Sequence, residues 1–410
     1  MNVNNHVKEE PNDLSKVTFL LGGIDILNKS LPPYAQETIN FLNDISTALL
    51  HDSEAKKYPD IVSFAFWCRK ANIIRLKEKE KIEKNRIGRG VVFHIAPSNI
   101  PINFAFTYAF GLLAGNANIV RLPSKKFPQT DIMVRIFRII LKEYPEIDAR
   151  TVWLQYPPDT KITSYFSKKA NARMLWGGDE TIQSIRRGDS NPKSIDLCFT
   201  DRYSIGMIDG NSVLNASDQE LAKLAENFYN DTWLMDQNAC SSPQLLLWFH
   251  SDARAKKRFW DTVVSVAKKR YRLQPSSAVD KYLQLCIDAS MYDFIDSMEH
   301  DGNILYRIQL QHIPEENTSL RGTCGYFYEY NLTEKDILSG LKNLDSIITE
   351  KYQTVTYYGI DPRILHQWVL ENRLKGIDRI VPFGKAMDIS VIWDGYDIIR
   401  MLSRIVHVET

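Results

Sequence analysis

The sequence has few cysteines and almost no net charge, and each scarcity excludes a class of protein. Its five cysteines show no paired spacing, so they predict neither a disulfide framework nor a zinc site. The eight histidines are scattered, and none lies at ligand spacing from another, so we expect no bound metal. Nucleic acids and anionic membranes select proteins with a basic surplus, which a formal net charge of +1 does not provide.

The sequence also lacks a long hydrophobic run. Its longest weakly polar stretch, residues 101–120, contains Asn103, Asn116 and Asn118, which favours a buried helix and strand over a membrane span. Residues 1–15 have no apolar core of the kind that signal peptides carry. Together with the missing disulfide pattern, this predicts a cytoplasmic chain without a membrane span.

Short apolar runs alternate with helical patterns in the first half of the chain. We expect strands at residues 91–95, 118–122, 151–155, 172–176 and 194–199, with helices at residues 102–113, 131–143, 162–169 and 181–187 between them. This alternation predicts an α/β fold with a doubly wound parallel sheet. Ligands of such sheets bind beyond the carboxyl ends of the strands, so the turns that follow the strands are the ones to inspect.

A length of 410 residues exceeds what one core usually supports, and the pattern changes after residue 208. We therefore predict a helical region and dinucleotide-binding domain at residues 1–209, a second α/β domain at residues 210–382, and a C-terminal segment at residues 383–410. This last segment is predicted to hold a helix at residues 396–403 and a final strand at residues 404–408. A terminal strand needs a partner, and we expect that partner in another domain or another subunit.

Cys240 has a different setting from the other cysteines. It follows an amide-rich turn, residues 236–239, and precedes two serines and an apolar strand. A thiol in such a turn can be partly exposed among hydrogen-bond donors, as a nucleophilic thiolate requires. The alternative, a free cysteine that only packs, stays open from this segment alone. The remaining four have the apolar or aromatic neighbours typical of buried structural thiols: Cys68, Cys198, Cys286 and Cys324.

The turn after the first predicted strand contains Asn99 between Pro97 and Pro101. The prolines stiffen the backbone, and a rigidly held side-chain amide is a good donor to an oxyanion. The alternative is an asparagine that caps the following helix.

The turns after the second and fourth predicted strands could bind a dinucleotide. Arg121 and Ser124 supply a cation and a hydroxyl suited to the adenosine ribose, and Arg121 could also bind a 2′-phosphate. Gly177 and Gly178 open a helix, where the backbone could approach a diphosphate. A solvated charge cluster is the alternative for the first turn. The second turn does not match the G-x-G-x-x-G pattern.

In their order and spacing, these segments resemble the aldehyde dehydrogenase superfamily. More closely, the chain is similar to the LuxC-type acyl-CoA reductases, the fatty acid reductases associated with bacterial luciferase systems. The resemblance spans roughly residue 59 to the C-terminus, and it rests on residues 90–101, 175–178, 236–243, 379–386 and 393–395. It implies an aldehyde dehydrogenase-like fold, with a cofactor domain, a catalytic domain and a terminal oligomerisation strand.

The resemblance further implies NADPH-dependent reduction of an acyl thioester, from acyl-CoA or an acyl-loaded protein, to an aldehyde. Cys240 would form a thioacyl enzyme, and Asn99 with the backbone N–H of Cys240 would hold the oxyanion. Arg121 stands where the superfamily usually has lysine, and Ser124 where many members have glutamate. The loss of that carboxylate favours NADPH over NADH. Pro97, Gly177 and Gly178 would complete the cofactor site. A homo-oligomer, and an acyl-protein synthetase as a partner, are also expected.

Two glutamates of the superfamily pattern are missing. The stretch 195–201 has none to activate water, although Asp201 could stand in, and the stretch 321–326 lacks the one that holds the nicotinamide ribose. The first absence fits a reductase, because a water activator would hydrolyse the thioacyl enzyme. Two other functions stay open. One is an NAD(P)-dependent aldehyde dehydrogenase that runs oxidatively, and the other is a non-redox acyl carrier or scaffold subunit of an acyl-protein synthetase complex.

Overall fold

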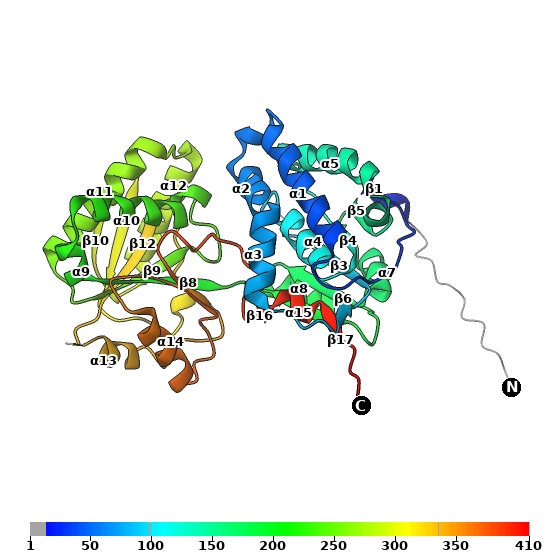
Figure 1. The fold of residues 1–410 in the computed structure, drawn as a ribbon. Coiled ribbons are helices and arrows are strands. Elements are labelled where there is room, and N and C mark those ends of the chain that lie inside the picture. Colours follow the sequence, from blue (N-terminus) through cyan, green and yellow to red (C-terminus); the bar gives the residue numbers. More distant parts are fainter. Residues whose placement is uncertain (1–13, 98–99, 335, 410) are drawn as a thin grey trace. The chain divides into compact units, whose positions relative to one another are not determined.

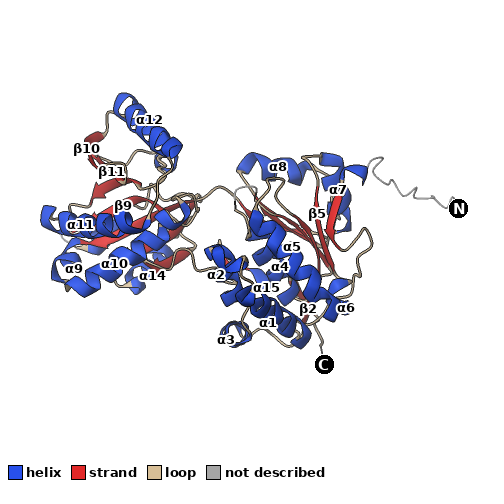
Figure 2. Cartoon of the chain, turned by 90° about the horizontal axis from the view of Figure 1, so that it is seen from above, coloured by secondary structure: helices blue, strands red, loops and turns tan. Residues whose placement is uncertain are grey.

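The computed structural model describes residues 14–97, 100–334 and 336–409, which form two compact units (Figure 1). The first unit extends to Thr200 and resumes at Tyr396, and the second comprises residues 201–395. Both are α/β, as Figure 2 shows by its red strands and blue helices. Among the described helices, none is long and apolar enough to cross a membrane.

The first unit is built on a six-stranded sheet with the order β1-β5-β4-β3-β6-β7. The five strands from β3 to β7 are parallel to their neighbours, and β1 pairs antiparallel with β5 at one edge. Their bounds are β1 (Thr18–Leu21), β3 (Val91–Ile95), β4 (Ala117–Arg121), β5 (Thr151–Gln155), β6 (Ala172–Trp176) and β7 (Ile195–Phe199). The order reverses direction between β3 and β6, which is the doubly wound arrangement that the sequence predicts.

Helices cover both faces of this sheet because alternate residues of each buried strand point to opposite sides. From β3, Phe93 packs with Phe166 of α7 in one core layer. The neighbouring His94 faces α4 instead, where its Nδ1 lies 2.7 Å from Thr107 Oγ1. The helices of this unit are α1 (Gln36–His51), α2 (Pro59–Trp67), α3 (Lys70–Glu80), α4 (Asn103–Leu113), α5 (Pro128–Ile140), α6 (Pro145–Asp148), α7 (Thr160–Lys169), α8 (Asp179–Arg187) and α15 (Ile398–Met401).

The second unit contains a seven-stranded sheet with the order β10-β11-β12-β9-β8-β13-β14. All neighbours are parallel except β10 and β11. The strands are β8 (Tyr203–Asp209), β9 (Pro243–Phe249), β10 (Ile295–Asp301), β11 (Leu305–Leu310), β12 (Tyr326–Asn331), β13 (Tyr352–Tyr358) and β14 (Arg379–Pro382). The helices are α9 (Gly210–Asn215), α10 (Asp218–Asp231), α11 (Ala253–Arg270), α12 (Pro275–Met291), α13 (Ile337–Lys342) and α14 (Pro362–Glu371).

The boundaries of the two units differ from those we expected at residues 209 and 382. β8 belongs to the second sheet, because its ladder partners are β9 and β13. The second unit also continues past β14, where the Arg379 guanidinium donates hydrogen bonds to the carbonyls of Lys385, Ala386 and Asp388. The chain then passes through β15 (Ile392–Trp393) and returns to the first unit at β16 (Tyr396–Asp397).

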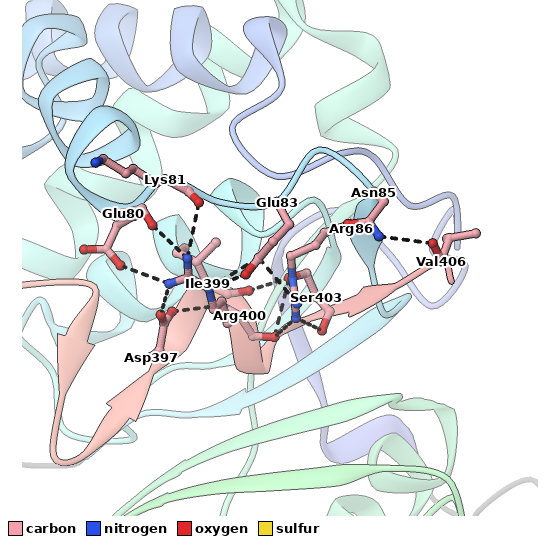
Figure 3. Close-up of polar contacts among 10 residues, drawn as sticks. All are labelled: Glu80, Lys81, Glu83, Asn85, Arg86, Asp397, Ile399, Arg400, Ser403 and Val406. Atoms are coloured by element: carbon pink, nitrogen blue, oxygen red, sulfur yellow. Dashed lines mark hydrogen bonds and ion pairs between the residues drawn. The ribbon is translucent and has the colours of Figure 1, made fainter. Parts of the chain in front are cut away.

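The C-terminal strand β17 (Ser403–Ile405) pairs antiparallel with β2 (Arg86–Gly88) of the same unit (Figure 3). The structure thus pairs it within its own unit, whereas we expected a partner in another domain or another subunit. Arg86 explains the preference. Its guanidinium donates to Ser403 Oγ at 2.9 Å, to the Ser403 carbonyl at 3.1 Å and to the Arg400 carbonyl at 2.6 Å. Arg400 in turn lies 3.2 Å from Glu83.

Arg86→Met should loosen β17 without unfolding the unit. The substitution removes three hydrogen bonds from a buried cation, and each such bond contributes about 1.5–3 kcal/mol. Amide hydrogen exchange in β17 should therefore speed up by roughly tenfold or more while exchange in β3 stays unchanged. Arg404→Met, at an exposed position of the same strand, serves as the control. Unchanged exchange in β17 of Arg86→Met would show that the arginine does not hold the strand.

Candidate active site

Cys240 lies in a tight loop between α10 and β9. The loop starts with two residues in the left-handed region, Asp236 at φ 52° and Gln237 at φ 60°. It closes with a hydrogen bond from the Ser242 N–H to the Ala239 carbonyl at 2.9 Å. Cys240 is partly exposed as a whole residue, and its carbonyl accepts a hydrogen bond from Ser204 Oγ at 2.6 Å. These hydrogen bonds fix the backbone of the loop that carries Cys240.

Two buried glutamine side chains fix this loop to the strand beside it. Gln237 Oε1 accepts from the N–H groups of Gly325 and Tyr326, both at 3.1 Å, and its Nε2 donates to the Tyr326 carbonyl at 2.9 Å. Gln244 Nε2 donates to the Gln237 carbonyl at 3.1 Å, and its Oε1 accepts from the Gly322 N–H at 2.8 Å. We call this pair the amide clamp. Buried amides with all these partners resist displacement, because breaking the set would leave polar groups unpaired.

The amide clamp brings the stretch 321–326 against the Cys240 loop. A further bond joins them, from the Cys324 N–H to the Asp236 carbonyl at 3.0 Å. This is the stretch in which the superfamily glutamate for the nicotinamide ribose is missing. In the structure, the backbone of this stretch forms hydrogen bonds that support the Cys240 loop.

Parallel strands gather their amino ends at one edge of the sheet, and Cys240 precedes β9 at that edge. Arg202 precedes β8, Gln353 is the second residue of β13, and Asp378 precedes β14. Arg202 joins two carboxylates here, since it forms an ion pair with Asp378 and its Nε lies 3.1 Å from Asp394 Oδ1. Gln353 Nε2 donates to the same Asp394 oxygen at 3.0 Å.

This polar cluster acts on the thiol of Cys240. Burial is the largest influence and raises the pKa of Cys240, because the surrounding protein atoms disfavour the charged thiolate. The carboxylate of Asp394 raises it further by repulsion, whereas a hydrogen bond from Gln353 and the positive charge of Arg202 lower it. Around neutral pH the thiol is therefore protonated, and its reaction with an acyl group requires loss of the proton. The pKa of Asp394 is itself raised, mainly by burial of its carboxyl group.

The sequence-predicted cofactor residues meet at one edge of the first unit. Pro97 follows β3, Arg121 ends β4 and Gly177 follows β6. These three strands are adjacent and parallel, so their carboxyl ends lie side by side. Asn99 lies outside the described residues. The structure thus brings together Pro97, Arg121, Ser124, Gly177 and Gly178 at the switch point of a doubly wound sheet.

Arg121 is held in place but retains an unused donor. Its guanidinium lies over the Tyr156 ring at 4.5 Å, and Nη2 donates to the Tyr156 carbonyl at 3.2 Å. Its Nε is buried and has no hydrogen-bond partner. Ser124 Oγ is 3.5 Å from the Tyr156 carbonyl, which is a weak contact. A phosphate or ribose at this edge would therefore meet a positioned cation with free hydrogen-bonding capacity.

The turn with Gly177 and Gly178 leaves room for a ligand at the start of α8. A Cβ built at Gly178 meets no atom within 4 Å, so the space in front of it is open. Gly178 is the N-cap of α8, and no side chain caps that end of the helix. Asp179 and Glu180 occupy its first turn, where negative charge is favourable. A helix start without a side-chain cap suits an anion, as the diphosphate interpretation requires.

The other candidates of the sequence analysis are Asp201 and the four cysteines other than Cys240. Asp201, the potential water activator, lies 3.0 Å from Arg321 and 3.8 Å from Lys351, so two cations engage its carboxylate. The interpretation of Cys286 as a buried structural thiol is wrong, because it is exposed on α12, while Cys68 and Cys324 are buried. Cys198 is partly exposed.

Sequence reasoning did not single out Arg202 and Gln353 at the Cys240 edge. Each comes from a strand far from Cys240 in the chain, and neither belongs to a recognisable motif. Asp394 did appear, within the segment 393–395 that supports the family resemblance, although without a role.

Comparison with known proteins places these features in a family. The family model for acyl-CoA reductase (LuxC) matches residues 32–312. No curated protein sequence matches the chain.

Solved structures share the fold at low sequence identity. The chain is similar to 1-pyrroline-5-carboxylate dehydrogenase from Thermus thermophilus, with a TM-score of 0.60 and 12% identity over 90% of this chain and 81% of that one. It is also similar to a glyceraldehyde-3-phosphate dehydrogenase from Methanocaldococcus jannaschii in complex with NADP, with a TM-score of 0.60 and 14% identity over 90% and 88%. The chain is also similar to bifunctional proline utilization A (PutA), with a TM-score of 0.61 and 14% identity. The match covers 88% of this chain but only 39% of that longer protein.

Substitutions at Asp394 and Gln353 should move the Cys240 pKa in opposite directions. Asp394→Asn removes a repelling negative charge, so the thiol pKa should fall and alkylation by iodoacetamide should speed up at pH values below it. Gln353→Leu removes a hydrogen bond to the thiolate, so the pKa should rise. The measurement is the pH dependence of alkylation at Cys240, followed by peptide mass mapping.

Asp361→Asn is the matched control, because Asp361 follows β13 at the opposite edge of the same sheet. It should leave the alkylation profile unchanged. Profiles that coincide for Asp394→Asn, Gln353→Leu and the unsubstituted chain would exclude an influence of this cluster on the thiol.

Proposed function

The chain belongs to the acyl-CoA reductase (LuxC) family, and from this premise we propose that it reduces an acyl thioester to an aldehyde with NADPH. The family and the aldehyde dehydrogenase-like fold support an aldehyde-related oxidoreductase activity. The acyl donor is acyl-CoA or an acyl-loaded protein. The observation that carries the proposal is the partly exposed Cys240 in a loop fixed by the amide clamp.

In the first half of the reaction, Cys240 loses its proton and its sulfur attacks the thioester carbonyl. A bond forms between Sγ and the acyl carbon, the bond from that carbon to the donor sulfur breaks, and the donor leaves as a thiol after taking up a proton. The Gln353 amide and the Arg202 cation favour the thiolate that starts this step, as their effect on the Cys240 pKa indicates. By family resemblance, Asn99 and the Cys240 N–H stabilise the negative charge on the carbonyl oxygen.

In the second half, the thioacyl group on Cys240 becomes an aldehyde. When bound in the first unit, NADPH would supply the hydride that reduces the acyl carbon. The Cys240 loop holds the thioacyl group in place, and the oxyanion donors stabilise the alkoxide that results. The bond between Sγ and the acyl carbon then breaks, the aldehyde leaves, and the thiolate of Cys240 is restored.

Two observations support binding of the cofactor to the first unit. Arg121 has a buried Nε without a partner, and the start of α8 is open and uncapped. We propose that Arg121 and Ser124 hold the adenosine ribose and its 2′-phosphate, while Gly177 and Gly178 admit the diphosphate and Pro97 shapes the turn after β3.

The reductive direction is supported by what surrounds Asp201. A hydrolytic aldehyde dehydrogenase needs a free carboxylate to activate water, and stretch 195–201 offers only this one near the position of the superfamily glutamate. Ion pairs with Arg321 and Lys351 engage this carboxylate. A carboxylate engaged by two cations supports the reductive direction, in which the thioacyl group is reduced and not hydrolysed.

The proposal is tested by incubating the purified chain with NADPH and acyl-CoA thioesters of increasing chain length. Aldehyde should form with matching consumption of NADPH. Cys240→Ala should abolish aldehyde formation, because no thioacyl enzyme can form. Cys286→Ser, at an exposed cysteine outside the site, should retain it. Aldehyde formation by Cys240→Ala would remove the mechanism, and acylation of Cys240 without any aldehyde would favour the acyl-carrier function.

Arg121→Ala should weaken NADPH binding more than NADH binding. The guanidinium makes charge-assisted hydrogen bonds to the 2′-phosphate, and losing them should reduce NADPH affinity by roughly tenfold or more. Lys125→Ala, a nearby cation that lies over the Phe127 ring, is the control. Cofactor fluorescence titrations give both dissociation constants. An equal loss for the two nucleotides would exclude the 2′-phosphate role.

A further inference from the structure

Helix α12 faces its own unit with polar residues. Lys281 is 2% exposed, and its Nζ donates to the carbonyls of Asn303, Ile304 and Cys324 at 3.0, 3.1 and 2.7 Å. Seven residues further on, Asp288 is fully buried and accepts hydrogen bonds from the hydroxyls of Tyr326 and Tyr328. The two charged side chains lie on one side of the helix and fasten it to β11 and β12.

The opposite side of α12 is an apolar stripe exposed to solvent. Its large members are Val279, Tyr282, Leu283, Ile287 and Met291, exposed by 67, 60, 56, 38 and 71%. They recur at helical spacing and so lie on one face, together with the exposed Cys286. The usual arrangement puts the apolar face inward. In Figure 2, α12 lies at the outer margin of its unit, beyond β10 and β11.

The stripe matches a second copy of itself. In an antiparallel pairing of two α12 helices centred on Leu285, Val279 meets Met291 of the other copy and Leu283 meets Ile287. The charged residues of α12 are Asp280, Lys281 and Asp288, of which two are buried on the inner side, so the stripe presents apolar groups to apolar groups. Such self-complementarity is what a two-fold interface requires. Because the formal net charge of the chain is only +1, electrostatic repulsion between two copies is small.

The exposed face of α12 alone is too small for a stable dimer interface, so the contact surface must include a neighbouring element. A helix of this length is about 25 Å long and roughly 10 Å wide, whereas a stable interface buries about 800 Å² on each partner. The chain continues from α12 directly into β10, the outer strand of the second sheet. Within the described residues, the outer edge of β10 has no strand partner, and an open edge of this kind favours association.

We propose that α12 and the adjoining edge strand β10 form a two-fold interface between two copies of this chain. The interface contains none of the residues placed at the reaction of Cys240, and it differs from the terminal strand β17, which is paired with β2 in its own unit. Apolar contact between the two stripes supplies the main driving force.

The first test measures molar mass by light scattering after size-exclusion chromatography over a range of concentrations. Leu283→Glu combined with Ile287→Glu should reduce the mass by a factor of two, because each copy would place charges in the apolar contact. Both positions are exposed, so the circular dichroism spectrum should not change. Leu338→Glu combined with Leu370→Glu is the matched control, since these residues of the same unit are exposed by 60 and 62%, and it should keep the mass.

The second test uses Cys286, which lies close to the two-fold axis of the pairing. A short bis-maleimide should join two unsubstituted copies through their Cys286 residues, and Cys286→Ser should abolish the cross-linked dimer. A monomer at every concentration would overturn the proposal, as would an unchanged mass for the Leu283→Glu, Ile287→Glu variant. A cross-link that persists in Cys286→Ser would assign the contact to another surface.

Discussion

The position of Cys240 depends on a pair of buried side-chain amides. The side chains of Gln237 and Gln244 form hydrogen bonds with six backbone groups, and they fix the Cys240 loop against the stretch that leads into β12. A loop of left-handed residues would otherwise lack regular hydrogen bonds. The clamp therefore converts an irregular segment into a rigid support, as covalent catalysis requires of its nucleophile.

The proposed cofactor site and the reactive thiol lie in separate units, each at the edge where parallel strands start or end. The first unit offers the carboxyl ends of β3, β4 and β6, where Arg121 and the glycine turn are suited to an anionic dinucleotide. The second offers the amino ends of β8, β9 and β13, where Arg202, Gln353 and Asp394 set the acidity of the thiol. Each edge gathers residues distant in sequence, since parallel strands start and end together.

Much of this could be predicted from the sequence, and the remainder depends on distant contacts. The parallel strands of the first unit follow from their apolar runs. The amide-rich turn indicates Cys240 as the candidate nucleophile, and this role stays a prediction. β8 was assigned to the wrong side of a boundary because a strand's membership depends on its ladder partners, which local patterns do not reveal. The same holds for β17, whose partner β2 lies far away in the chain. Gln353 and Arg202 carry no motif, and only the sheet brings them to Cys240.

The central claim is that Cys240 carries the acyl group between its donor and the hydride. The most direct measurement incubates the chain with one acyl-CoA in the absence of NADPH, maps the adduct by peptide mass spectrometry, and then adds NADPH. The account predicts one acyl group on the peptide that contains Cys240, lost on addition of NADPH with release of an equal amount of aldehyde. An adduct on another residue, or an acyl group that leaves as the free acid, would contradict it.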